Sequence, residues 1–143
     1  MKTRKTWLRV WLPAFAMASA LGVAGSAPTA SADPGCEIRE NSPHTDWGSY
    51  TWPIDLYCNN TTGDVTSQSF AGSPATGRMT KTTSWFVCWK IGSPHAGKNS
   101  VWYYTKGDEV VNNPGQQGWG YMPASALGTT KAPFPGLRKC SWG

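Results

Sequence analysis

Two short segments carry the side chains that are best suited to recognition chemistry. Residues 101–105 read VWYYT and residues 118–122 read GWGYM, and the polar, turn-rich stretch KGDEVVNNPGQQ lies between them. Aromatic rings bury a large area at low entropic cost, so an exposed row of rings can stack on a glycan or clamp a peptide. The same rings can instead form the core of a small domain. The sequence leaves both interpretations open.

Alternate side chains in each segment point to the same side of an extended chain. Trp102 and Tyr104 share one face of the first segment, and Trp119, Tyr121 and Pro123 share one face of the second. If the segments pair as a β-hairpin, aromatic contacts across the strands are expected. We therefore predict that these five residues form a ligand-binding surface in which at least Trp102 is partly exposed.

Signatures of catalysis and metal binding are absent from the sequence. The two histidines, His44 and His95, do not form a His-x-x-x-His pair, and there is neither a Gly-x-Ser-x-Gly elbow nor a glycine-rich phosphate loop. Nothing distinguishes Asp46 and Asp55 from solvated loop carboxylates. We therefore expect a protein that is not an enzyme and that needs no metal or other cofactor.

The four cysteines, Cys36, Cys58, Cys88 and Cys140, predict two disulfides if the protein is exported. Three pairings are possible, and the sequence does not decide among them. Cys58 and Cys88 each continue an apolar strand face, whereas Cys36 and Cys140 lie near the two ends of the mature chain. Because domain termini are often close together, we favour Cys58–Cys88 with Cys36–Cys140.

The N-terminus has the pattern of a secretory signal peptide. A basic start precedes the uncharged apolar run VWLPAFAMASALGV at residues 10–23, and Ala30-Ser31-Ala32 matches an A-x-A cleavage site. We predict cleavage after Ala32 and a secreted, extracellular protein. A retained membrane helix is the alternative, but the run is shorter than the roughly 20 residues that span a bilayer. No cysteine directly follows the cleavage site, which argues against a lipoprotein anchor.

The charge of the mature chain does not favour nucleic acid as a partner. The full chain has 13 basic and 8 acidic residues, a net charge of +5, but four of the basic residues lie in residues 1–32. The remainder has a net charge of +1, and its basic residues are scattered rather than clustered into a patch. Residues 33–143 have the size of one domain. We expect a monomer with no membrane association after cleavage.

The spacing of apolar runs predicts an all-β fold. Runs of β-branched and aromatic residues recur between Gly and Pro signals at residues 51–58, 80–91, 101–105 and 118–122. Residues 84–91 are apolar on both faces, which predicts a central strand that is covered on both sides. Residues 33–53, with Trp47 and Trp52, are expected to form an ordered arm over a barrel domain at residues 54–143.

Several of these motifs resemble secreted bacterial SH3-like domains. The stretch GYMPASAL at residues 120–127 resembles the end of an SH3 domain, where a glycine, two apolar residues and a proline precede a 3₁₀ turn. VWYYT resembles the preceding tryptophan-led strand, and FVCWKIG at residues 86–92 is similar to a middle strand. The resemblance covers residues 54–127 and implies a small SH3-like barrel. Ala126 replaces an aromatic residue of the proline-peptide groove, so proline-rich ligands are not implied.

Three classes of function follow from these observations. The resemblance implies a secreted binding module whose partner is cell-wall peptide or glycan. A small disulfide-stapled inhibitor or toxin that acts on an extracellular protein is the second class, and an ordered, protruding loop at residues 92–100 or 105–117 would favour it. An enzyme of minor activity is the third.

Overall fold

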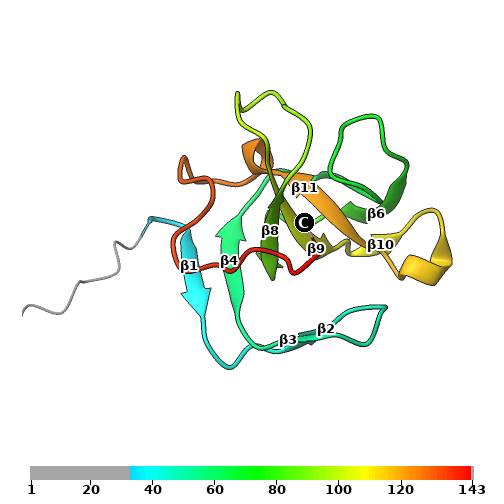
Figure 1. Ribbon diagram of the computed structural model, residues 1–143, viewed down its shortest axis with the longest axis horizontal. Helices are drawn as coiled ribbons and strands as arrows, with labels where there is room; N and C mark the ends of the chain where they lie inside the picture. The colour runs from blue at the N-terminus through cyan, green and yellow to red at the C-terminus, as the bar shows by residue number, and fades with distance from the viewer. Residues whose placement is uncertain (1–32, 143) are drawn as a thin grey trace, which may run out of the picture. The chain divides into compact units, whose positions relative to one another are not determined.

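The computed structural model describes residues 33–142, which form three antiparallel β-sheets and two 3₁₀ turns (Figure 1). The prediction of an all-β fold with two disulfides is confirmed. The predicted signal peptide and its cleavage site after Ala32 lie outside the described residues. In the described part of the chain, no helical segment has the length and apolarity needed to traverse a bilayer.

The strands divide among the three sheets as follows. The first sheet has the order β1 (Cys36–Arg39), β4 (Asp55–Asn59) and β7 (Thr83–Phe86). The second has the order β10 (Glu109–Val110), β6 (Ala75–Met79), β5 (Gly63–Thr66), β11 (Trp119–Pro123), β9 (Val101–Lys106) and β8 (Cys88–Ile91). A ribbon consists of β2 (His44–Thr45) and β3 (Thr51–Trp52). The predicted small barrel is not formed, because the strands divide among three sheets that do not close on one another.

The predicted pairing of the two aromatic segments is confirmed, because β9 and β11 are antiparallel neighbours. Tyr104 lies opposite Tyr121, and Trp102 lies opposite Pro123. On its other side β11 meets β5, and a Cβ at Gly120 would lie only 2.2 Å from the carbonyl oxygen of Thr66. Glycine at this position therefore permits the close approach of β11 to β5.

The prediction of one central strand at residues 84–91 is wrong. The chain forms β7 and β8, which belong to different sheets and lie at an edge of each. Between them the backbone N–H of Val87 donates a hydrogen bond to the carbonyl oxygen of Tyr104 at 2.9 Å. The run is apolar on both faces because Phe86 and Val87 pack into two different hydrophobic clusters.

Two hydrophobic clusters lie on opposite faces of the β9–β11 hairpin. The inner cluster draws side chains from both large sheets; its members include Leu56, Val65, Met79, Phe86, Tyr103 and Met122. The aromatic cluster occupies the other face and consists of Trp52, Val87, Cys88, Trp102, Tyr104, Trp119, Tyr121 and Cys140, with Trp85 packed against it. The alternation of β9 and β11 thus sends successive side chains to different clusters.

The predicted disulfide pairing is wrong, since the bonds are Cys36–Cys58 and Cys88–Cys140. Cys36 lies directly opposite Cys58 in the β1–β4 ladder, with 4.0 Å between their Cα atoms. Cys58 faces the inner cluster and Cys88 faces the aromatic cluster, so their side chains are on different sides of the fold. The two disulfides indicate an oxidising environment.

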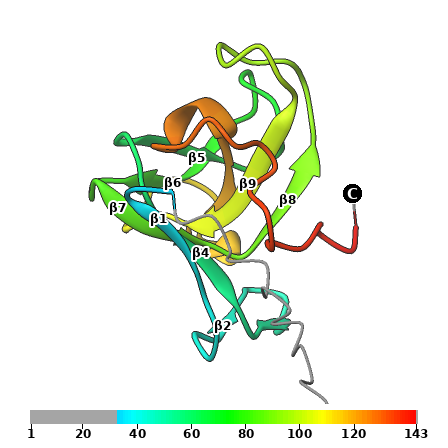
Figure 2. The ribbon, with the colours of Figure 1, turned by 90° about the vertical axis from the view of Figure 1, so that its left-hand side faces the viewer.

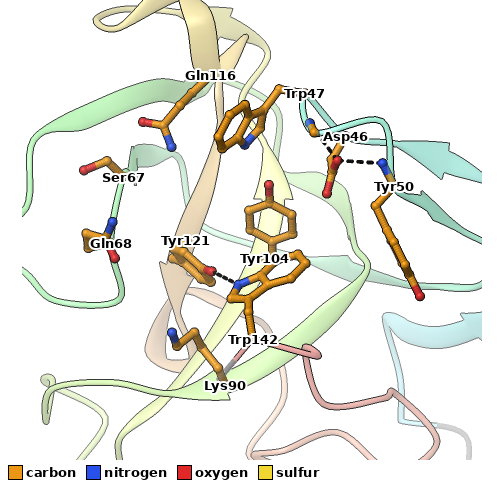
Figure 3. A pocket seen from close by; sticks show the side chains of 11 residues that line it. Asp46, Trp47, Tyr50, Ser67, Gln68, Lys90, Tyr104, Gln116, Tyr121 and Trp142 are labelled. Carbon is orange, nitrogen blue, oxygen red and sulfur yellow. Dashed lines mark hydrogen bonds between the residues drawn. The ribbon is translucent and has the colours of Figure 1, made fainter.

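Residues 33–53, which were expected to form an arm, contribute strands of their own. β1 adds to the edge of β4, as Figure 2 shows, and the β2–β3 ribbon follows it. Trp52, at the end of this ribbon, is only 1% exposed and belongs to the aromatic cluster. The segment thereby brings the turn between β2 and β3 next to the aromatic face of the hairpin (Figure 3).

Candidate functional site: an aromatic cleft

A cleft of about 450 Å³ opens beside the aromatic cluster (Figure 3). This volume falls in the range of sites that bind small molecules. The cleft is lined by Asp46, Trp47, Gly48, Tyr50, Ser67, Gln68, Lys90, Tyr104, Gln116, Tyr121 and Trp142. These residues come from the β2–β3 turn, the chain after β5, strands β8, β9 and β11, the 3₁₀ turn η1 (Pro114–Gln116) and the C-terminal tail.

The floor of the cleft is formed by Tyr104 and Tyr121, whose ring centroids are 5.1 Å apart. Burial raises the pKa of both tyrosines, and the negative charge of Asp46 adds to the effect. Both hydroxyl groups are therefore protonated at neutral pH. The indole N–H of Trp142 donates a hydrogen bond to the Tyr121 hydroxyl oxygen at 2.6 Å, which leaves the Tyr121 proton for another acceptor.

Two tryptophans rise from this floor and keep much of their surface exposed. Trp47 is 48% exposed and Trp142 is 45% exposed. Trp142 packs edge-on against Tyr104, with ring centroids 5.3 Å apart, and against Trp52 at 5.4 Å. The neighbouring Trp47 side chain partly offsets the rise in the pKa of Tyr104. Trp142 is thus anchored by its neighbours although it is half exposed.

Asp46 shapes the turn that carries Trp47. Its Oδ1 atom accepts hydrogen bonds from the backbone N–H groups of Gly48 at 2.9 Å and Tyr50 at 3.0 Å. Its Oδ2 atom accepts a third hydrogen bond, at 3.3 Å, from the indole of Trp52. Asp46 is only 8% exposed, so its carboxylate is engaged within the protein and positions the turn.

A buried carboxylate anchors the start of the ribbon. Asp55 accepts hydrogen bonds from Arg39 Nε at 2.9 Å and Nη2 at 2.5 Å, and it contacts His44 Nε2 at 2.7 Å. The His44 ring stacks on Trp85 with 3.7 Å between centroids. Burial alone would raise the pKa of Asp55, but the hydrogen bonds from His44 and Arg39 and the Arg39 charge outweigh it, and the net pKa is lowered.

The remaining lining of the cleft is polar. Gln116 Oε1 accepts a hydrogen bond from Asn113 Nδ2 at 2.8 Å, which leaves the two amide protons of Gln116 for a ligand. Ser67 shares a hydrogen bond of 2.7 Å with Ser73. Lys90 Nζ lies 5.6 Å from the centroid of the Tyr121 ring. The cleft therefore combines flat apolar rings with amide, hydroxyl and ammonium groups.

Two of the five predicted ligand-binding residues, Tyr104 and Tyr121, line the cleft, while Trp102, Trp119 and Pro123 do not. The predicted exposure of Trp102 is wrong, because only 1% of its surface is accessible. The loop after β8 covers it: the Trp102 indole donates to the Ser93 carbonyl oxygen at 2.8 Å, and the His95 ring packs against it edge-on.

Trp119 and Pro123 have other roles in the fold. Trp119 is 2% exposed and packs against the rings of Trp85 and Tyr104, each with its centroid 5.2 Å away. Pro123 ends β11 and precedes the second 3₁₀ turn, η2 (Ala124–Ala126).

Sequence reasoning missed most of the rim of the cleft. Trp47 and Trp142 were not proposed as ligand contacts, although the Asp-Trp-Gly-Ser sequence at residues 46–49 has the composition of a tight turn that displays its ring. Trp142 follows Cys140 by two residues, so a correct disulfide pairing would have located it. Nothing in the sequence distinguishes Lys90, Gln68 or Gln116 from other polar surface residues.

Neither histidine faces the cleft. His44 is held by Asp55 and Trp85, and His95 contacts the Val101 carbonyl oxygen and the Gly97 N–H. Within residues 33–142, no group of three or more His, Cys, Asp or Glu side chains is arranged to hold a metal ion. Neither histidine is therefore placed to exchange a proton with a ligand in the cleft.

Comparison with known proteins gives no assignment for the chain. No family model, curated protein or solved structure matches it. Function is therefore inferred from the chemistry of the cleft.

Proposed function

We propose that this protein is a secreted, non-catalytic binding module that recognises cell-wall peptide or glycan in the aromatic cleft. The observation that carries the proposal is the pair of half-exposed rings of Trp47 and Trp142 beside Tyr104 and Tyr121. Rings of this kind provide stacking surfaces at little entropic cost, and the hydroxyl groups provide direction.

The state of the carboxylates supports binding rather than catalysis. Asp46 accepts three hydrogen bonds from the protein, and Asp55 is fully buried by Arg39 and His44. A general acid or base has to reach the substrate within hydrogen-bonding distance. Both carboxylates instead serve to hold the ribbon that carries Trp47.

Two further features support a secreted module of the bacterial SH3-like type. The A-x-A pattern and the two disulfides are typical of an exported protein. Strands β9 and β11 are followed by the 3₁₀ turn η2, in the order that the SH3 resemblance implies.

The test is sedimentation of the secreted protein with insoluble peptidoglycan. We expect the wild type to pellet with the wall material, and Trp47→Ala and Trp142→Ala to remain mostly in the supernatant while keeping their folded spectra. Ile91→Ala is the matched control, because Ile91 is 56% exposed but does not line the cleft. Equal sedimentation of all four proteins would contradict recognition in the cleft.

A second candidate is an inhibitor or toxin that acts on an extracellular protein, and one loop favours it. The chain between β8 and β9 extends beyond the end of the six-stranded sheet (Figure 1). It is ordered by His95, which contacts the Val101 carbonyl oxygen at 3.0 Å, and by a backbone bond from Ser93 to Ser69 at 2.9 Å. Capture of a secreted protein that is lost with a shortened loop, but kept in Trp47→Ala, would support this function.

A further inference from the structure

We infer that the cleft selects an acidic saccharide, with Lys90 binding the carboxylate while Trp47 and Trp142 contact the sugar ring. This inference rests on the proposed function and narrows its ligand from wall peptide or glycan to a glycan that carries a carboxylate. It is drawn from the charge, the shape and the strand pairing of the cleft.

The charged groups of the cleft leave Lys90 to bind an anion. Asp46 and Lys90 are its two charged lining residues, and the Asp46 carboxylate is already engaged by three donors. Lys90 is half-buried and, among the described residues, has no carboxylate within ion-pairing distance. A ligand carboxylate that reaches Lys90 therefore gains a charge-assisted hydrogen bond without breaking an ion pair of the protein.

The shape of the cleft favours a ring. Figure 3 shows Trp47 and Trp142 on the aromatic side, with Ser67, Gln68 and Gln116 facing them across the opening. The apolar C–H face of a pyranose fits against the exposed indoles, and its hydroxyl groups match the amides. No described residue forms a hydrogen bond with the Gln68 side chain, and Gln116 keeps its amide protons.

The strand pairing disfavours an extended peptide. Peptides that bind along a sheet usually pair with the backbone of an exposed edge strand. The floor strands β9 and β11 are interior strands, with β8 and β5 as their outer neighbours. The free side of β8 is itself occupied near the cleft, because the Trp89 N–H donates to Arg138 and the Trp89 carbonyl oxygen accepts from Cys140.

The experiment compares two forms of one glycan by titration calorimetry. Wall glycan strands are released from their peptides, so that their sugar carboxylates are free, and half of the sample is converted to the neutral amide. Wild type, Lys90→Gln and Lys90→Arg are titrated with both forms. We expect the wild type to bind the acidic form about tenfold more tightly, which is the scale of one charge-assisted hydrogen bond.

Lys90→Gln should bind both forms with the affinity that the wild type shows for the amide, and Lys90→Arg should retain the preference. Raising the salt concentration should weaken binding of the acidic form only. Equal binding of both forms by the wild type, or a preference that survives Lys90→Gln, would overturn the inference but leave the proposed function intact.

A parallel titration with the released wall peptides separates the remaining outcomes. If the wild type bound the peptides but neither form of the glycan, the inference of an acidic saccharide would be overturned. The proposal that the protein recognises the cell wall would remain. Failure of the wild type to bind glycan or peptide would overturn both the inference and the proposed function. Thermal melts of the two Lys90 variants check that they fold, which is expected because Lys90 lies at a half-exposed edge position.

Discussion

The two faces of the β9–β11 hairpin both carry buried side chains but differ in what covers them. Tyr103 and Met122 on one face pack into the inner cluster, which the three-stranded sheet completes with Leu56 and Phe86. Tyr104 and Tyr121 on the other face are covered by the β2–β3 turn and the C-terminal tail. A sheet covers its neighbour continuously, whereas these two short segments leave a cleft between them.

The comparison shows why burial and accessibility do not coincide in this cleft. Tyr104 is only 4% exposed and Tyr121 only 5%, yet both line the cleft, because the ring edges and hydroxyl groups of its floor are reached from above. The exposed area belongs to Trp47 and Trp142, which come from segments far from the hairpin in sequence. Each disulfide also serves one face, since Cys36–Cys58 belongs to the inner cluster and Cys88–Cys140 to the aromatic cluster.

The largest effect is expected from a comparison of the buried Trp102 with the half-exposed Trp47. Trp102→Ala should lower the free energy of unfolding by roughly 3–5 kcal/mol, because a fully buried indole is removed. Trp47→Ala should cost about 1 kcal/mol or less, since the ring is half exposed, but should abolish binding to wall material. Denaturant unfolding and sedimentation with peptidoglycan measure both quantities on each variant.

The outcome that contradicts this prediction is a stable Trp102→Ala protein that has lost binding. Such a result would restore Trp102 as a ligand contact. If Trp102→Ala loses wall binding only under conditions where it unfolds, then Trp102 stabilises the fold and does not contact the ligand.

The second prediction compares the two disulfides. Replacing Cys88 and Cys140 by Ser should destabilise the protein by about 4 kcal/mol, and the same change at Cys36 and Cys58 by about 3 kcal/mol, because the bonds span 52 and 22 residues. Only the first change should also impair the cleft, since Cys140 fixes the tail that carries Trp142. Unfolding and wall binding below the melting temperature distinguish the two. Equal binding by both double variants would contradict a role for Cys88–Cys140 in holding the cleft.

The elements that local pattern determines could be predicted from the sequence. Period-two alternation and turn residues located the β9–β11 hairpin, and the even number of cysteines predicted two disulfides. The disulfide pairing failed because it depends on which face each cysteine occupies. Cys58 and Cys88 both continue apolar faces, but of different sheets, since the chain changes sheets at Val87.

The cleft itself could be predicted only in part, because it is built by long-range packing. Alternation identified Tyr104 and Tyr121 on the correct face. The exposure of Trp102, however, depends on a loop that folds back over it, and no pattern within β9 reports that loop. Likewise, Trp142 reaches Tyr104 from 38 positions away along the chain.

The third prediction concerns the β2–β3 ribbon, whose turn partly covers the aromatic cluster. Asp55→Asn should cost about 2 kcal/mol at neutral pH, the scale of hydrogen bonds to a charged group. The lowered pKa of Asp55 means that its stabilisation is present above the ordinary value of 3.8 and is lost as the pH falls through the folded value. Asp55→Asn should therefore show a flatter loss of stability below about pH 4. Unfolding curves from about pH 2.5, roughly one unit below the ordinary carboxyl pKa, up to about pH 7 measure it.

The matched control is Asp64→Asn, which removes a carboxylate whose ion pair with Arg78 is more than half exposed on both sides. An exposed pair contributes little, so both neutral-pH stability and the acid limb should stay close to those of the wild type. If Asp64→Asn flattened the acid limb as much as Asp55→Asn did, the buried anchor of the ribbon would not be the source of the acid sensitivity.

The smallest expected effect is a change in stability at alkaline pH, and it concerns Tyr103 of the inner cluster. Burial raises its pKa from 10.0 to about 12, although the hydrogen bond that its hydroxyl oxygen accepts from the Phe134 N–H at 2.9 Å acts in the opposite direction. The folded pKa lies above the unfolded one, so this residue's contribution to stability is complete below pH 10 and is lost as the pH rises toward 12. The loss from this residue alone is about 1.4 kcal/mol at pH 11. Tyr103→Phe should therefore lose less stability than the wild type between pH 9 and pH 11, although it starts from a lower value. Tyr104 and Tyr121 also have raised pKa values. Tyr103→Phe should therefore reduce the loss of stability at alkaline pH without removing it. If Tyr103→Phe lost as much stability between pH 9 and pH 11 as the wild type, the alkaline sensitivity would belong to Tyr104 and Tyr121 alone.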